Sequence, residues 1–137
     1  MYSRFTIQQL ATLIAAGNLA GGALALAAST VTPVPDIPSF AGPTYLLGLF
    51  AVNWLHGVMH LVIGALGLVS AHVHCSARSY LVGHTLWFAF LAAFGFIASP
   101  ELQPAHSAAG IWINGPDHWG HVFLLSASLL VLILHRR

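Results

Sequence analysis

The sequence predicts an all-α fold, a bundle of four helices that cross a membrane. Of the 137 residues, 58% are hydrophobic and only 5% are charged, whereas soluble domains carry about a quarter charged residues. Asp, Glu, Lys and Arg are absent between positions 37 and 77, 79 and 100, and 118 and 135. Each of these intervals has room for a helix of about 20 residues, the length that crosses a hydrocarbon core of roughly 30 Å.

The helices are expected in four segments. The first covers residues 5–29, where small residues four apart permit close helix contacts. Prolines follow it and predict an extended loop, because proline cannot continue a helix. The second helix is expected over 45–72, the third over 79–98 and, after a second loop, the fourth over 117–135. The second would be about 40 Å long, so it must tilt or begin along the membrane interface.

The few charged residues predict the orientation. In a chain that crosses four times, all four arginines fall on one side and all three acids on the other. The positive-inside rule then places both termini in the cytoplasm. We therefore expect an integral membrane protein, surrounded by membrane lipids. The net charge of +1 comes without any lysine, so no basic surface is available and nucleic acid is excluded as a partner.

The second and fourth segments carry the same polar pattern, offset by 61 positions. Polar groups in hydrocarbon cost several kcal/mol each unless they have partners. Because these polar residues recur at helical spacing in both segments, they predict one shared site near the non-cytoplasmic face. The offset also indicates two helical hairpins related by a weak internal repeat. The residues are Asn53, His56 and His60 in the first pattern and Asn114, Asp117 and His121 in the second.

Four interpretations of this cluster stay open. One is a structural hydrogen-bond network that fixes helix register, with Asn53 and Asn114 as members. Another is a proton or ion path that uses the acid and the histidines. The remaining two involve a bound metal ion or a bound cofactor.

A metal site would use His56, His60, Asp117 and His121 as ligands. Two histidines four residues apart on a helix have ligand spacing, and imidazoles with one carboxylate suit zinc, iron or manganese. A haem or chlorophyll would instead need one or two axial histidines at matching depth. His60, His121 and His84 are the candidates for that role.

Three further polar residues are expected to have simpler roles. If His84 is no ligand, it is a hydrogen-bonded packing residue of the third segment. Asn18 in the first segment is expected to bridge helices. His118 points about 100° away from Asp117 on a helix, so it faces the lipid headgroups or serves as a ligand.

The loops are short and leave little room for a water-soluble active site. The first and third segments carry small residues on more than one face, as helices that contact neighbours do. These observations favour an accessory or structural subunit of a larger photosynthetic or respiratory complex, in contact with other membrane subunits, over a free-standing enzyme. The alternative is a metal-binding membrane protein or metalloenzyme with a His/Asp site between the second and fourth helices.

The two patterns also carry a resemblance to a known family. Segments 53–60 and 114–121 read NWLHGVMH and NGPDHWGH, and Gly64, Gly67 and Leu68 follow the first. Together they resemble the two signatures of a bacterial family catalogued as domain of unknown function 4383. The resemblance implies a small four-helix protein of a bacterial inner membrane or a thylakoid and supplies no mechanism.

Overall fold

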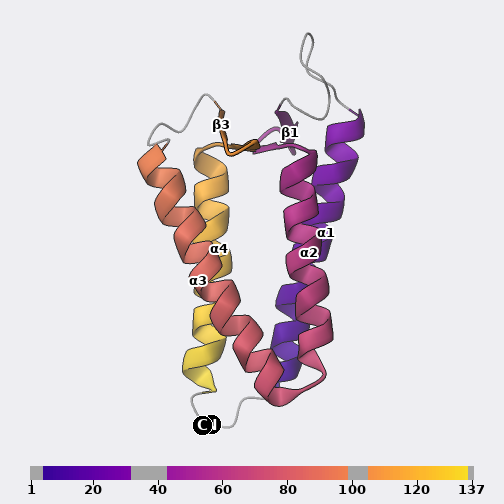
Figure 1. Cartoon of the computed structure of the whole chain (residues 1–137), viewed down its shortest axis with the longest axis vertical. Coiled ribbons are helices and arrows are strands. Elements are labelled where there is room, and N and C mark those ends of the chain that lie inside the picture. The colour runs from indigo at the N-terminus through magenta and orange to yellow at the C-terminus, as the bar shows by residue number, and fades with distance from the viewer. Residues whose placement is uncertain (1–4, 32–42, 99–104, 136–137) are drawn as a thin grey trace.

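A computed structural model describes residues 5–31, 43–98 and 105–135. In these residues the chain forms four helices, each long and apolar enough to cross a membrane. They are α1 (Ile7–Val31), α2 (Trp54–Ala71), α3 (His74–Ala98) and α4 (Gly115–Leu134). The start of α1 and the end of α4 lie at the same end of the bundle (Figure 1). The predicted all-α four-helix bundle is confirmed.

The boundaries differ from expectation mainly at α2. This helix begins at Trp54, so its predicted start near residue 45 is wrong. With 18 residues it is about 27 Å long and needs no strong tilt to fit a membrane. Helix α3 begins at His74 rather than near residue 79, so only two residues separate it from α2. The prolines at 33, 35 and 38 lie outside the described residues.

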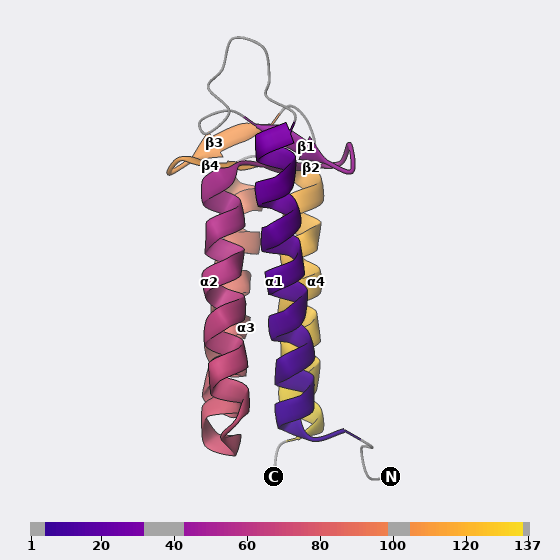
Figure 2. The same ribbon diagram turned by 90° about the vertical axis from the view of Figure 1, so that its right-hand side faces the viewer.

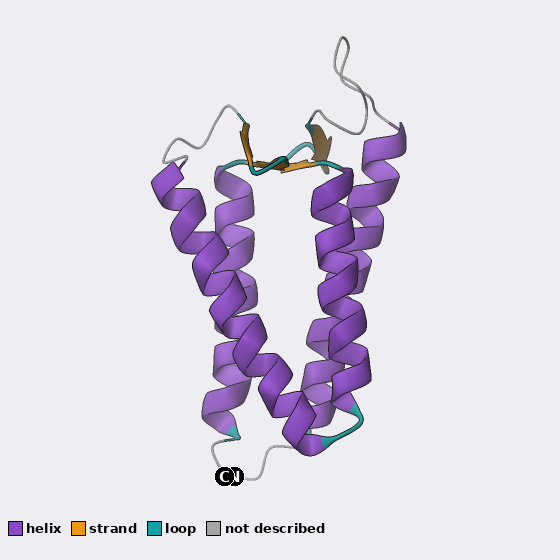
Figure 3. Ribbon diagram, in the orientation of Figure 1, coloured by secondary structure: helices purple, strands orange, loops and turns teal. Residues whose placement is uncertain are grey.

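The residues ahead of α2 and α4 form two β-hairpins (Figure 3). The first lies where a helix was expected, and the second lies where a loop was expected. Their tight turns contain Leu47 and Gly48 in one and Ala109 and Gly110 in the other, all with positive φ, as short hairpin turns require. Strand β2 lies against β4, so the hairpins together cover this end of the bundle. The strands are β1 (Thr44–Leu46), β2 (Phe50–Val52), β3 (His106–Ala108) and β4 (Ile111–Ile113).

The helices pack as two pairs, α1 with α2 and α3 with α4, and α1 also contacts α4 (Figure 2). Glycines hold the first pair together. A Cβ at Gly22 would lie 2.7 Å from the carbonyl oxygen of Gly57, and one at Gly64 would lie 2.8 Å from that of Ala15. Both distances are too short for a real side chain, so only glycine permits this contact between membrane helices.

Reciprocal hydrogen bonds join the two halves of the chain. The Asn53 side chain donates Nδ2–H to the carbonyl of Gly110 at 2.7 Å. The Asn114 side chain donates in the same way to the carbonyl of Leu49 at 2.8 Å. The two donor residues, Asn53 and Asn114, are 61 positions apart, and so are the two acceptor residues, Leu49 and Gly110. Each half of the chain also has the order helix, hairpin, helix. The internal repeat is therefore present in the fold.

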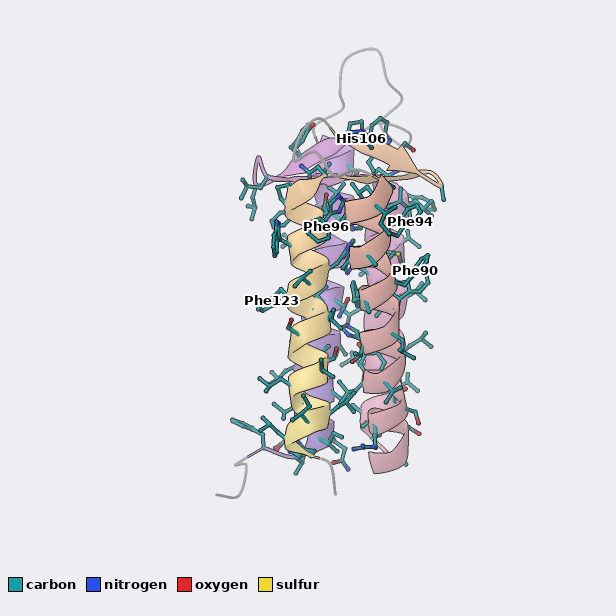
Figure 4. All side chains as sticks on the ribbon, turned by 90° about the vertical axis from the view of Figure 1, so that its left-hand side faces the viewer. Phe90, Phe94, Phe96, His106 and Phe123 are labelled. Atoms are coloured by element: carbon teal, nitrogen blue, oxygen red, sulfur yellow. The ribbon has the colours of Figure 1, made fainter. Side chains whose placement is uncertain are left out.

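The outer surface of the bundle is apolar. Phe90 and Phe94 project outward from α3, and Phe123 projects outward from α4 (Figure 4). At the end away from the hairpins, a small core contains Ile7 and Leu81. The two charged residues that the structure describes, Arg78 and Asp117, lie near the starts of α3 and α4, where a membrane helix carries charge at the least cost.

Candidate functional site

Three histidine rings meet beneath the hairpins, between the two helical pairs. His56 and His60 come from α2, and His121 comes from α4. One ring nitrogen of each lies within 4.8 Å of those of the other two. His56 and His121 are only 3% and 5% exposed. We call these three residues the histidine cluster.

The start of α2 presents two of the rings on one face. Asn53 caps the helix, and its Oδ1 accepts the backbone N–H of His56 at 3.0 Å. His60 follows one turn later, so both rings share a stripe. They stack with 5.1 Å between centroids. The cap thus fixes the depth at which the cluster begins.

His56 is oriented by the opposite half of the chain. Its Nδ1 lies 3.1 Å from the carbonyl oxygen of Trp112, in β4. A carbonyl only accepts, so Nδ1 carries the proton and Nε2 carries the lone pair. This ring therefore has a nitrogen available as a ligand.

His60 is oriented by Asn18 of α1. The Asn18 Nδ2 donates to the carbonyl of Ile14 at 2.9 Å, which assigns the other amide atom as the oxygen. That oxygen lies 3.1 Å from Nδ1 of His60. The His60 Nδ1 must therefore donate, and its Nε2 lone pair is also left free.

The chain of hydrogen bonds continues beyond Asn18 into the other helical pair. Asn18 Nδ2 lies 3.0 Å from Nε2 of His84, and Nδ1 of His84 lies 3.1 Å from the Ser128 hydroxyl. Ser128 donates in turn to the carbonyl of Leu124 at 3.0 Å. Residues from all four helices thus form one directed chain, in which each group donates to the next, from the ring of His60 to the carbonyl of Leu124.

His121 differs from the other two rings. Its Nδ1 is fully buried and has no hydrogen-bond partner among the described residues. A buried polar atom without a partner costs about 1–3 kcal/mol. The fully buried ring of Phe88 packs below it at 5.5 Å between centroids and also contacts His60 at 5.7 Å. The cluster therefore has an apolar floor and, in the Nδ1 of His121, a fully buried nitrogen without a hydrogen-bond partner among the described residues.

Asp117 lies beside the cluster but serves its own helix. Its Oδ2 accepts the backbone N–H of Asn114 at 2.9 Å, and the Asn114 Oδ1 accepts the N–H of Asp117 at 3.4 Å. Together they form a capping box, with Pro116 in the first helical turn. The structure therefore places Asp117 in the wall of the adjoining cavity and outside the group of three ring nitrogens.

The other histidines of the interior lie apart from the cluster. His84 is linked to it by a hydrogen bond through Asn18, and the ring of Phe88, which contacts the cluster, also packs against His84 at 4.5 Å. His118 is 1% exposed and packs on Gly95 and Phe96. The expectation that His118 faces lipid headgroups is wrong, because the missing side chain of Gly95 leaves room for its ring inside the α3–α4 pair.

Three neutral imidazoles at this separation are a donor set for a transition-metal ion. Zinc binds imidazole nitrogens at about 2.0–2.1 Å, so its tetrahedral site would bring them to about 3.3 Å from one another. The ring nitrogens lie within 4.8 Å of one another, so they would have to move closer by up to about 1.5 Å. A cavity of about 210 Å³ adjoins all three rings and gives a fourth ligand access.

Two parts of the site were outside the reach of sequence patterns. The carbonyl of Trp112 carries no side-chain signal, and its role depends on how β4 lies over α2. Phe88 is one apolar residue among many in α3, and its place beside the rings of His60 and His121 depends on how the helices pack. Asn18 was expected to bridge helices, and the structure confirms that it does so.

The chain belongs to the family described as Domain of unknown function (DUF4383), which it matches over residues 8–134. This confirms the family that the two polar patterns resemble. No curated protein and no solved structure matches the chain. The histidine cluster is therefore the principal guide to function.

Proposed function

We propose that this protein binds a transition-metal ion, zinc first among them, through His56, His60 and His121 within the membrane. The unsatisfied, buried Nδ1 of His121 is the observation that carries the proposal, because a metal ion would give this atom the partner that it lacks. Three imidazoles with a fourth position left open are the ligand set of zinc sites that activate a bound molecule.

The surroundings of two rings support the proposal. Metal-binding histidines almost always donate their second ring N–H to a carbonyl, a carboxylate or water, which fixes the tautomer and the direction of the ligand atom. His56 has the Trp112 carbonyl in this position and His60 has the Asn18 amide oxygen. Both rings are thus held ready to bind a metal ion.

Asp117 is proposed as a neighbour of the ion rather than a ligand. Its carboxylate is engaged at the start of α4 by the N–H of Asn114, and it lines the same cavity as the cluster. A carboxylate there is suited to accept a hydrogen bond from a molecule at the open position.

The role of an accessory subunit in a photosynthetic or respiratory complex stays a prediction, as does ligation of haem or chlorophyll. The packing favours a single ion over a macrocycle. The three rings are 5.1–6.4 Å apart between centroids, and Phe88 fills the space below them. A planar macrocycle would have to separate these side chains.

We also propose that the hairpin end lies outside the cytoplasm. Arg78 is near the start of α3, at the end where α1 begins and α4 ends, and its side chain donates to the carbonyl of His135. Basic residues favour the cytoplasmic side. The cluster would then lie near the outer boundary of the membrane.

Metal analysis of the detergent-purified protein tests the proposal. We expect about one equivalent of zinc or a related ion, its loss in His121→Ala, and its retention in His72→Ala, which alters an exposed histidine between α2 and α3. An absorption spectrum of the same sample separates this outcome from a haem or chlorophyll. Purified protein that takes up no metal from a zinc-, cobalt- or iron-containing buffer contradicts the proposal.

A further inference from the structure

The cavity beside the histidine cluster opens toward the side of the bundle. Its inner end is formed by the three rings and Asp117, and its outer walls by α1 and α4. Phe123 belongs to the wall and is 71% exposed, and it projects from the outer face of α4 (Figure 4). The cavity therefore reaches the surface that faces acyl chains in a membrane.

The end of the bundle that would meet water is closed. Leu46, Phe50 and Val52 of the first hairpin line the top of the cavity, and Val52 is buried. A polar solute from the aqueous side would have to pass these side chains. Entry from the side meets less resistance, because the α1 wall contains Gly21, at which an added Cβ would meet nothing within 4 Å.

Building on the proposed metal site, we infer that this cavity binds an amphiphilic molecule from the lipid phase, with a carboxylate or carbonyl oxygen on the metal. The walls beyond the rings and Asp117 are apolar, so the rest of the ligand must be apolar too. Drug-sized ligands occupy roughly 300–1,000 Å³, and this cavity has about 210 Å³. Only the head and the first part of the chain fit inside, and the remainder lies along α1 and α4 among the lipids.

Two hydroxamates with the same metal-binding group and different chains test the inference. Acetohydroxamate has one methyl group, and octanohydroxamate has an alkyl chain. The cobalt(II)-loaded protein in detergent reports binding through its visible absorption bands, which change when the fourth ligand changes. We expect octanohydroxamate to bind at least about tenfold more tightly, the gain from burying about two methylene groups.

A pair of variants separates the cavity from simple partitioning into detergent. Gly21→Leu fills the cavity, and Gly17→Leu makes the same change one turn away, where an added Cβ also meets nothing within 4 Å. The partitioning of octanohydroxamate into detergent is the same for both variants. We expect Gly21→Leu to weaken octanohydroxamate binding about tenfold and Gly17→Leu to leave it unchanged.

Three results would overturn the inference. If the protein binds cobalt but has equal affinity for the two hydroxamates, the metal site stands and the binding of an amphiphilic molecule is refuted. Equal octanohydroxamate affinities in Gly21→Leu and Gly17→Leu would place the ligand elsewhere. Failure to bind cobalt at all would refute the metal site itself, and the inference with it.

Discussion

Replacing Asn18 by leucine removes the link between the histidine cluster and the rest of the hydrogen-bond chain. Leucine has a similar size, so the change alters hydrogen bonding more than packing. It takes away the acceptor for His60 Nδ1–H and the donor to His84 Nε2. Without the amide, His60 is free to adopt the tautomer with its proton on Nε2, and that nitrogen then has no lone pair for a metal ion.

The size of the effect follows from these two lost bonds. Interhelical hydrogen bonds in membranes contribute about 0.6 kcal/mol each, which sets a lower bound near 1 kcal/mol on the loss of stability. Leaving both ring nitrogens buried without partners costs about 1–3 kcal/mol apiece, so the upper value is about 6 kcal/mol. Removing the partner of a metal-binding histidine weakens metal affinity about 10–100-fold.

Zinc affinity is measured by competition with a chromophoric chelator in detergent, and stability by SDS titration followed through helical circular dichroism. Thr12→Val is the matched control, because it removes a hydrogen bond within α1, to the carbonyl of Gln8, on an exposed face. We expect Asn18→Leu to lose affinity and the control to keep it. Wild-type zinc affinity in folded Asn18→Leu would refute the claim that this amide orients His60.

Three further changes probe the scaffold and its orientation. Asn114→Ala removes the cap of α4 together with its bonds to the first hairpin, and we expect SDS unfolding to show a loss of about 1–3 kcal/mol. Gly64→Val forces α1 and α2 apart and should cost about 1–3 kcal/mol in the same assay, whereas Gly17→Val, in open space, should be nearly neutral. Ser107→Cys lies exposed in β3 and, in a Cys75→Ser background, should react with a membrane-impermeant maleimide added to intact cells; protection until the cells are opened would reverse the proposed orientation.

The sequence was sufficient for the helices because charge is so sparse. The uncharged stretch after Asp117 defines α4, and the one between Arg78 and Glu101 covers most of α3, although α3 begins earlier, at His74. The same property concealed the hairpins. Thr44–Leu46 and Phe50–Val52 are apolar three-residue strands, too short to show an alternating pattern, and they merge with the apolar run of α2.

The polar patterns located the cluster but left the role of each member open. Their helical spacing is enough to place His56, His60 and His121 on facing stripes. The capping role of Asp117 was not predicted, since the pattern made it a candidate metal ligand; in the structure Asn114, Pro116 and Asp117 stand at the cap, first-turn and third positions of α4. Which nitrogen of each ring is free depends on contacts across the bundle, and no spacing within one segment reports those.

A difference between the two halves gives the cluster its open side. His60 and His121 occupy equivalent positions of the repeat, and so do His56 and Asp117. The longer imidazole of His56 reaches across to the carbonyl of Trp112 in the other half, whereas the short Asp117 side chain reaches back to the N–H of its own cap at Asn114.

A fully symmetric pair of halves would present four imidazoles, the ligand number of a closed structural zinc site. With Asp117 in the fourth place, three rings remain, and the cavity of about 210 Å³ adjoins them on the side of α1 and α4. The exchange of one imidazole for a capping carboxylate therefore has two effects. It stabilises the start of α4, and it leaves the proposed ion a position at which a further molecule is able to bind.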